Sequence, residues 1–477
     1  MELIYNIVKK IFSKKSILLL IFAIIVTSCR SFIPDPGYTS SNEYFNTQST
    51  TAYDADVIVV GSSIAGWSAA LASARRGTKT ILISETSCFG GQAGCAGVGS
   101  WDGKGFGSLN NLLIKNTEAE YRTHNVRLGG CYGGEALPYT ATNSRITGRE
   151  NFFEGDAFCP NPDVVSDEMK ALLDLYKVPV IGPIDVLSIG IDGTVLTNQG
   201  TLKGKIVVEA TETGELIPAS LRHPVDPLCK QSVTWVADIK EPGTPGNRIG
   251  DLTYPVDDAY ITKLSDWWTS GKYYWAGLTG QEGLPIYRRS HQLDGTVTIG
   301  LNWMNDAATP TESKDLTMQQ LVFLGSHGYQ DWVWSLHEIP YTRTSDFRLN
   351  GEAHLGATVR GVDTFPDSAA LGMYRADYHG TACPNLEASE PYGTYDIPLG
   401  IGVPVTKVPI LVALGRSGDI SDVRATSFRM QPNEVDFGEA IGTLASLAVE
   451  QDALPQDVPV SDVRNILRSY GSLVDVP

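Results

Sequence analysis

Four residues near the start of the chain have the types and the spacing that bind a nucleotide diphosphate. Gly61 follows the apolar run VIVV directly, and Ser63 and Gly66 come soon after it. Glu85 lies 19 residues beyond Gly66. A turn at the start of a helix presents unpaired backbone N–H groups to a diphosphate, here including those of Ile64 and Ala65. An acidic residue about 20 positions further on accepts hydrogen bonds from ribose hydroxyls.

The surrounding residues predict a strand–helix–strand unit that places these groups at one edge of a sheet. Val57–Val60 is continuously apolar, as expected of a parallel strand buried on both faces. Small residues between Ala65 and Arg76 predict a helix that packs closely on the sheet, and Gly77 predicts its end. Thr80–Ile83 predicts the second strand. Ser63 stands where the usual motif has its middle glycine, so a βαβ unit with a purely structural role is the alternative.

Four later segments resemble FAD-dependent oxidoreductases of the glutathione-reductase-like class. They are SCFGGQAGCAGVGSW (87–101), KIVVEATETGELIPAS (205–220), PILVALGRSGDIS (409–421) and FRMQPNEVDFGEAIGTLASLAVE (428–450). Three more resemble a bacterial FAD-dependent oxidoreductase family: DPLCKQSVTWVADI (226–239), VTIGLNWMNDA (297–307) and DSAALGMYRADYH (367–379). Within the resemblance, Glu212 stands where the family usually has glycine.

The resemblance implies an α/β protein with a Rossmann-like, three-layer FAD-binding fold and an inserted α+β substrate domain, the cap. We expect the FAD-binding domain at residues 54–220 and 396–477 and the cap at 221–395. FAD is the implied cofactor, and no metal site is expected. The implied cofactor-binding residues are Gly61, Ser63, Ile64, Ala65, Gly66, Glu85, Gly90, Gly91, Ala210, Gly415, Arg416, Pro432 and Gly438.

A helix from about Pro432 to Glu450 is predicted to point its start at the flavin, where the positive end of the helix dipole would stabilise negative charge. A substrate oxidation also needs a base. The candidates are His379, His291 and His354, and His379 ranks first because it lies in the family-resembling segment 367–379, beside Asp377 and Tyr378. Possible anchors for an acidic substrate are Arg288, Arg289 and Arg360.

Seven of the nine tryptophans fall between Trp235 and Trp334. Such a cluster forms either a stacking platform for a flat substrate or the core of the cap, and core filling is the plainer explanation. Cys88 and Cys95 lack the spacing of a redox-active pair and are expected to be structural or free. The cysteine spacing determines no disulfide pairing.

The first 28 residues predict an export signal, because four lysines precede the short apolar run ILLLIFAIIV (17–26). The following Cys29 resembles the acylated cysteine of bacterial lipoproteins, and residues 29–53 read as a solvated tether. The signal has no twin arginine, so we expect export of an unfolded chain that acquires FAD afterwards. An ordinary secretory signal is the alternative.

The formal net charge of −17 disfavours nucleic acid as a partner. No second glycine fingerprint follows Glu85, so the expected electron acceptor is oxygen, a quinone or a protein. The sequence thus predicts a membrane-anchored FAD oxidoreductase of unknown oligomeric state that acts on a small molecule outside the cytoplasm. The alternatives are a flavin-free module that binds a ligand or glycan, and a carbohydrate-active hydrolase or lyase.

Overall fold

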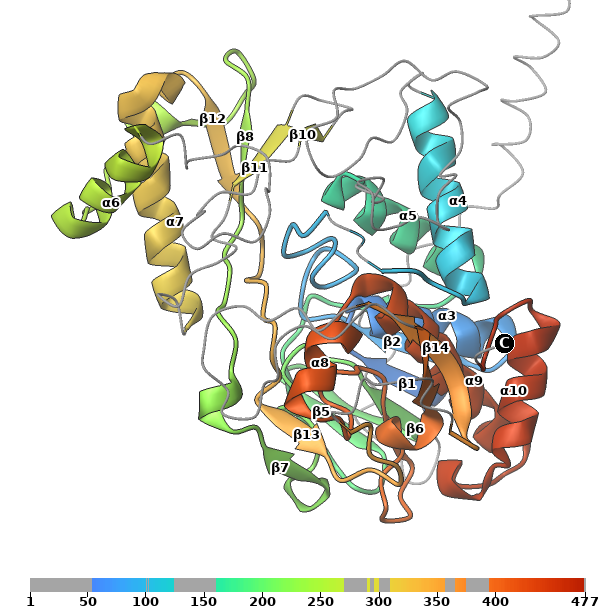
Figure 1. Cartoon of the computed structure of the whole chain (residues 1–477). Coiled ribbons are helices and arrows are strands. Elements are labelled where there is room, and N and C mark those ends of the chain that lie inside the picture. The colour runs from blue at the N-terminus through green and yellow to red at the C-terminus, as the bar shows by residue number, and fades with distance from the viewer. Residues whose placement is uncertain are drawn as a thin grey trace, which may run out of the picture. The chain divides into compact units, whose positions relative to one another are not determined.

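A computed structural model of the chain divides into two compact units, Met1–Glu43 and Tyr44–Pro477. The structure describes residues 54–99, 101, 103–123, 160–269, 290–291, 296–299, 309–356, 365–374 and 394–475, all in the second unit (Figure 1). The predicted signal and tether lie outside the described residues.

The opening stretch forms the predicted strand–helix–strand unit: β1 (Ala55–Val60), α3 (Ile64–Arg75) and β2 (Thr80–Ile83). The Ser63 hydroxyl caps α3 by accepting a hydrogen bond from the Gly66 N–H at 3.0 Å. Gly77 follows the helix with a φ of +88°, a conformation that favours glycine. The predicted helix therefore differs from the observed one by a single residue at each end.

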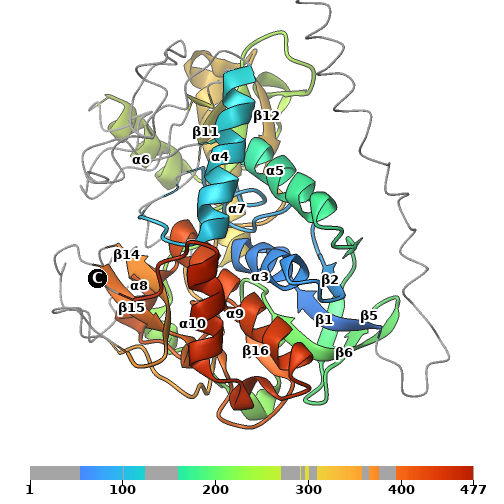
Figure 2. The ribbon, with the colours of Figure 1, turned by 90° about the vertical axis from the view of Figure 1, so that its right-hand side faces the viewer.

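The central sheet is parallel and runs in the order β3 (Val180–Ile181), β2, β1, β6 (Gly200–Glu209) and β16 (Ile410–Val412). Glu209 of β6 pairs with Val60 of β1 on one side and with Val412 of β16 on the other. Figure 2 shows β16, from near the C-terminus, beside β6. Distant parts of the chain therefore complete one sheet, and its strands end at one common edge.

Antiparallel strands form a second layer against this sheet. β4 (Val186–Ile189) and β5 (Thr194–Thr197) make a hairpin that pairs with the first half of β6. Buried side chains of the hairpin, such as Val195, share a core with Ile58 and Ile83 of the parallel strands. Helices cover the opposite face, so the fold has three layers. The predicted three-layer α/β class is confirmed.

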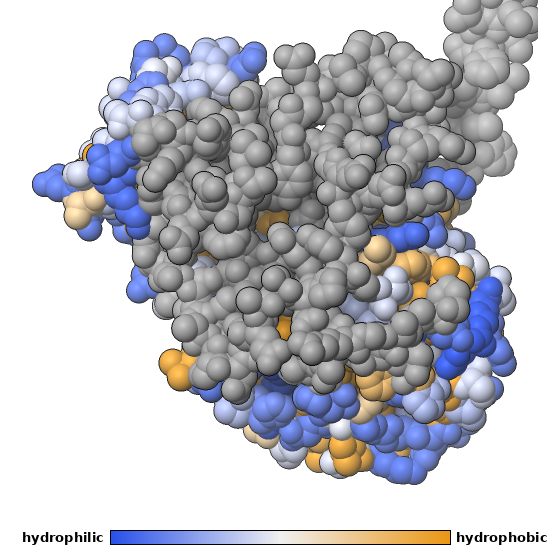
Figure 3. Space-filling model, viewed as in Figure 1, coloured by the Kyte–Doolittle hydropathy of each residue, from blue (hydrophilic) through white to orange (hydrophobic). Residues whose placement is uncertain are grey.

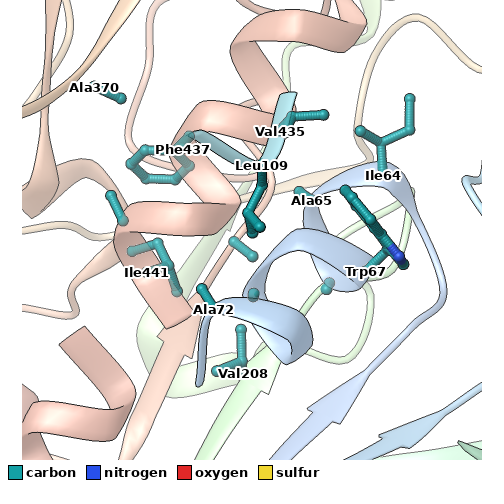
Figure 4. Packing of buried hydrophobic residues seen from close by; sticks show 14 of the residues in the cluster. Ile64, Ala65, Trp67, Ala72, Leu109, Val208, Ala370, Val435, Phe437 and Ile441 are labelled. Carbon is teal, nitrogen blue, oxygen red and sulfur yellow. The ribbon is translucent and has the colours of Figure 1, made fainter. Parts of the chain in front are cut away.

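The helical layer is built around α3 and α9 (Gln431–Glu450), with α4 (Ser108–Thr123), α5 (Pro162–Leu175) and α10 (Val460–Ser469) beside them. A Cβ added at Gly438 would lie 2.4 Å from the carbonyl oxygen of Ala65, and one at Gly442 would lie 2.1 Å from that of Ala69. The two helices therefore touch backbone to backbone, which only glycine permits here. Figure 4 shows this interface and its apolar neighbours.

A second sheet is formed by residues of the predicted cap. Its strands are antiparallel, in the order β10 (Ser290–His291), β11 (Thr296–Ile299), β8 (Ala237–Lys240), β12 (Val333–Leu336) and β9 (Asn247–Arg248). α6 (Asp258–Thr269) and α7 (Pro310–Leu324) share a core with this sheet. The described part of the cap is therefore α+β, while the domain limits at 220/221 and 395/396 stay predictions.

Three described tryptophans of the cap, Trp268, Trp332 and Trp334, pack half-buried against its core. Trp268 of α6 meets Phe323 of α7 edge to face, with ring centroids 5.8 Å apart. Trp332 and Trp334 pack against the same buried cluster. For these three residues the packing favours core filling over a stacking platform. Trp275 and Trp303 lie outside the described residues.

Shorter elements complete the fold: β7 (Arg222–Pro224) pairs with β13 (Phe347–Leu349), β14 (Ser368–Met373) pairs with β15 (Thr394–Pro398), and α8 (Asp422–Phe428) precedes α9. On the face drawn in Figure 3, hydrophilic residues cover much of the lower described surface, and hydrophobic residues appear in small separate patches. Such scattered patches are ordinary for a protein surface. Among the described residues, no helix has the length and apolar character that a membrane span requires.

Candidate functional site

Four turns meet at the edge where the parallel strands end. β1 leads into Gly61, β2 into Glu85, β6 into Ala210, and β16 into the turn that carries Arg416. Ligands of open α/β sheets bind at this carboxyl edge. The topology therefore brings residues from four separate parts of the sequence to one place.

The turn between β1 and α3 is narrow and made of backbone. Gly61 has a φ of +110°, and a Cβ added to it would lie 2.3 Å from the carbonyl oxygen of Ala210. A Cβ on Gly66 would lie 2.1 Å from the carbonyl oxygen of Gly61. Because the first N–H groups of a helix have no intrahelical partner, Ile64 and Ala65 present donors here. The turn therefore offers backbone donors to an anion.

The glycine-rich loop after β2 is tied to that turn. The Gly90 N–H donates to the carbonyl oxygen of Ser62 at 2.8 Å. Cys88 and Cys95 form a disulfide that closes the loop around Gly90 and Gly91. Of the two roles expected for these cysteines, structural or free, the bond agrees with the structural one. The sequence had determined no pairing.

The cap holds the same loop from its other side. The Glu338 carboxylate, just after β12, accepts a hydrogen bond from the Ser87 N–H at 2.9 Å. The Glu338 N–H donates to the carbonyl oxygen of Cys95 at 3.1 Å. The second sheet therefore contacts the loop that carries Gly90 and Gly91.

Glu85, the predicted ribose acceptor, lies at the exposed end of this edge, two residues beyond β2. Its Oε1 accepts a hydrogen bond from the Val186 N–H at 3.2 Å. Partial desolvation of the carboxyl group raises the pKa of Glu85. The Val186 hydrogen bond opposes this shift, and the nearby carboxylates of Asp185 and Glu215 add to it. The second carboxylate oxygen is left for another donor.

Arg416 is fully buried, and its guanidinium meets three oxygens. Two belong to carboxylates: Glu212, and Glu434 at 3.2 Å from Nε. The third is the carbonyl oxygen of Thr342, which accepts a hydrogen bond. Burial raises the pKa of Glu434, and Arg416 opposes that shift. The cluster thus sets two carboxylates against the guanidinium of Arg416, and the guanidinium of Arg429 acts on Glu434 and Arg416 from nearby.

Glu212 places its carboxylate between the glycine-rich loop and α3. A Cβ added to Gly91 would lie 2.0 Å from Glu212 Oε1 and 3.1 Å from the Cα of Ser63. Glu212 was marked in the sequence only as a departure from glycine. Its contact with Arg416 was not foreseen, because neither local pattern refers to the other.

The start of α9 is joined to the glycine-rich loop through Gln92. Its Nε2 donates to Glu434 Oε2 at 3.0 Å and to the carbonyl oxygen of Arg429 at 2.8 Å. Pro432 is the second residue of α9, close to the first position that the sequence favoured. Gly438 lies almost two turns further on, against Ala65 of α3.

Packing explains why residue 415 is a glycine. A Cβ at this position would lie 1.6 Å from a ring carbon of Phe428, so the missing side chain makes room for that ring. Its predicted role in cofactor binding stays a prediction.

Of the three histidines proposed as bases, the structure describes the side chain of one. His354 pairs through Nδ1 with Asp419, and its side chain is 58% exposed. His291 lies in β10, and its side chain is outside the described part of the structure. His379 also lies outside the described residues, as do the proposed substrate anchors Arg288, Arg289 and Arg360.

A different histidine, not singled out in the sequence, is buried beside the loop. His337 Nε2 lies 3.0 Å from Asp238 Oδ2, and its ring covers Gly97, whose added Cβ would lie 2.4 Å from it. Burial alone would lower the pKa of His337, but the Asp238 carboxylate outweighs burial and raises it. No local motif marks the pair, because Asp238 lies in β8 and His337 directly follows β12, far apart in the sequence.

Glu209, the last residue of β6, is a second buried group that the sequence reasoning missed. Its carboxyl group accepts a hydrogen bond from the Thr211 N–H at 3.0 Å. Burial raises the pKa of Glu209 to about 7. The sequence does indicate such a group, because Glu209 directly follows the apolar run IVV (206–208). An apolar run of this kind predicts a strand that is buried on both faces.

Comparisons with known proteins were made against family models, curated proteins and solved structures. A model described as FAD dependent oxidoreductase matches residues 56–222 and 278–467, which is more than half of the chain. The search of curated proteins gave no significant match.

Solved structures resemble the chain at low sequence identity. Aklavinone-11 hydroxylase, in a ternary complex with FAD and aklavinone, is 12% identical over 84% of this chain and 64% of that chain, with a TM-score of 0.42. The oxygenase of 2-methyl-3-hydroxypyridine-5-carboxylic acid is 9% identical over 87% and 86%, with a TM-score of 0.39. L-Proline dehydrogenase from P. horikoshii is 14% identical over 88% and 99%, with a TM-score of 0.34.

Proposed function

The chain belongs to the family of FAD dependent oxidoreductases, and from that premise we propose that it exchanges electrons with a small organic molecule outside the cytoplasm. The protein is an FAD-dependent enzyme at the level of its family. Its substrate, electron acceptor and location are the parts that we propose.

The narrow turn at the start of α3 is the observation that carries the proposal, because it fits a dinucleotide. A side chain at Gly61 would fill the space beside Ala210, and the glycine leaves the backbone donors accessible. We assign the diphosphate to the N–H groups of Ile64 and Ala65. The ribose hydroxyls are assigned to the free oxygen of Glu85.

The opposite end of the cofactor is assigned to the start of α9. When bound, FAD would accept an electron pair and release it again. The positive end of the α9 dipole, near Gln431 and Pro432, stabilises negative charge placed before it. The Gln92 bridge between Glu434 and the Arg429 carbonyl holds the glycine-rich loop against this helix start. The chain itself thus binds and orients the group.

The cap is assigned to the substrate, because it contacts the glycine-rich loop through Glu338. A substrate that loses a proton needs a base, for which His379, His291 and His354 are proposed from the sequence. His337 is a further candidate, since Asp238 holds it beside the same loop. Oxygen, a quinone or a partner protein is proposed as electron acceptor.

The proposed location is the outer side of a bacterial membrane. The basic and apolar segment of residues 1–28, Cys29 and the polar tether support it. A lipid on Cys29 would hold the enzyme at the surface while the tether gives it reach.

The test is the visible spectrum of the protein expressed from Ser31 onward, followed by anaerobic additions of sugars, amines and hydroxy acids. Flavin absorbance that one substrate class bleaches supports the proposal and identifies the class. A colourless protein that takes up no added FAD but binds glycans would establish the flavin-free module instead.

A further inference from the structure

One carboxylate lies where the proposed site needs positive charge. A Cβ added to Gly91 would lie 2.0 Å from Glu212 Oε1 and 3.1 Å from the Cα of Ser63. The Glu212 oxygen is therefore at most about 5 Å from the Cα of Ser63. Ser63 caps α3, and the donors of Ile64 and Ala65 follow it directly. The Glu212 carboxylate therefore lies between the glycine-rich loop and the helix start.

The groups around Glu212 are those that would attract any anion. Arg416, fully buried, contacts its carboxylate, and the positive end of the α3 dipole is near. Neither Glu212 oxygen is exposed to solvent, and within the described structure neither makes a hydrogen bond of good geometry. A buried carboxylate that depends on a single ion pair is poorly compensated for the loss of water.

We propose that Glu212 is an internal anion that sets the affinity for FAD: its carboxylate competes with the diphosphate for Arg416 and for the start of α3. The inference rests on the proposed function, because it assigns the diphosphate to the same turn. Binding of FAD then requires the Glu212 side chain to turn away from Arg416, since two anions close together in a buried place repel each other.

This arrangement has a consequence for folding. Arg416 already pairs with Glu434, and Glu212 adds a second carboxylate before any cofactor arrives. A chain that crosses the membrane unfolded must fold first and bind FAD afterwards. Glu212 lets Arg416 stay buried in that interval, at the expense of weaker FAD binding.

The experiment measures the dissociation constant of FAD, by quenching of its fluorescence, for the wild-type protein, Glu212→Gln and Glu212→Gly. Glu212→Gln keeps the shape and removes the charge, and Glu212→Gly removes both. We expect Glu212→Gly to bind FAD at least about tenfold more tightly, with Glu212→Gln between it and the wild type. ADP, which carries the diphosphate, should follow FAD, whereas adenosine should bind all three proteins equally.

The matched control is Glu241→Gln, which removes one negative charge from an exposed turn of the cap. It should leave the FAD affinity at the wild-type value. Thermal melts without FAD give a second measurement: both Glu212 variants should melt at a lower temperature than the wild type, because Arg416 loses a partner. With saturating FAD this order should reverse.

The outcomes separate this inference from the function on which it rests. If the wild type binds FAD and both Glu212 variants bind it equally or more weakly, Glu212 does not compete and only this inference fails. If the variants bind FAD and adenosine more tightly by the same factor, the effect is not on the diphosphate and the inference is also overturned. If no variant binds FAD while circular dichroism shows all of them folded, both this inference and the proposed function fail.

Discussion

The free energy of unfolding of the wild-type protein should fall between about pH 4.5 and pH 7, as Glu209 ionises. The substitution Glu209→Gln should abolish this decrease. Glu209 ends the buried strand β6, and burial raises the pKa of its carboxyl group from 4.5 to about 7. The Thr211 N–H donates to one oxygen, and the second oxygen has no partner within the described structure. Ionisation therefore places a poorly compensated charge in the interior.

The sign follows from proton binding. A group whose pKa is higher in the folded than in the unfolded protein binds more protons when folded, so the free energy of unfolding falls as the pH rises through that window. The difference between 4.5 and about 7 amounts to about 3 kcal/mol, at about 1.4 kcal/mol for each pH unit. The loss begins near pH 4.5 and is complete above about pH 7.

Urea unfolding of the protein from Ser31 onward, at intervals from pH 4 to pH 8.5, measures the effect. The advantage of Glu209→Gln over the wild type should grow by about 3 kcal/mol across this range. Because only the change with pH is compared, any constant effect of the new amide cancels. The exposed neighbour Glu215 supplies the control: Glu215→Gln should run parallel to the wild type. Parallel curves for Glu209→Gln would show that Glu209 is not buried as the structure has it.

Four further substitutions test other parts of the protein. Gly438→Ala places a methyl group 2.4 Å from the carbonyl oxygen of Ala65, so it should cost about 1–3 kcal/mol in unfolding experiments and reduce the ratio of flavin to protein absorbance. Gly442→Ala lies one turn further from the start of α9. It should lower the stability by a similar amount but reduce the flavin content less. Glu85→Lys should lower FAD retention strongly, because a cation cannot accept from ribose hydroxyls; unchanged occupancy would remove Glu85 from the site. Cys29→Ala should move the protein from the membrane to the soluble fraction of cells, and a protein that stays with the membrane would refute the lipid anchor.

The contact between the cap and the glycine-rich loop has a bearing on function. Glu338 and His337 belong to the segment after β12, while Cys88, Cys95 and Gly97 belong to the loop. If the loop holds the cofactor and the cap holds the substrate, as we propose, the two sites adjoin at this contact.

Local patterns in the sequence were enough to predict the first strand–helix–strand unit. Continuous apolar runs predicted β1 and β2, a short stretch of small residues predicted α3, and the acid after β2 was found by its distance from Gly66. Such features depend on residues close together in the chain, where periodicity and turn chemistry act. The resemblance of separate segments to one family then predicted that the residues of β16 and α9 belong to the same FAD-binding domain as β1 and β2.

Tertiary structure alone decided which charges meet. Arg416 follows β16, Glu212 follows β6 and Glu434 begins α9, and they come together because parallel strands end at one edge and α9 packs on α3 through Gly438. The His337–Asp238 pair likewise exists only because β8 and β12 are neighbours. No local pattern encodes such pairs, since their energies depend on burial and on distances between residues far apart in the chain. The sequence thus determined the glycine turn that we propose as the diphosphate site, and the folded structure determined that the Glu212 carboxylate lies beside it.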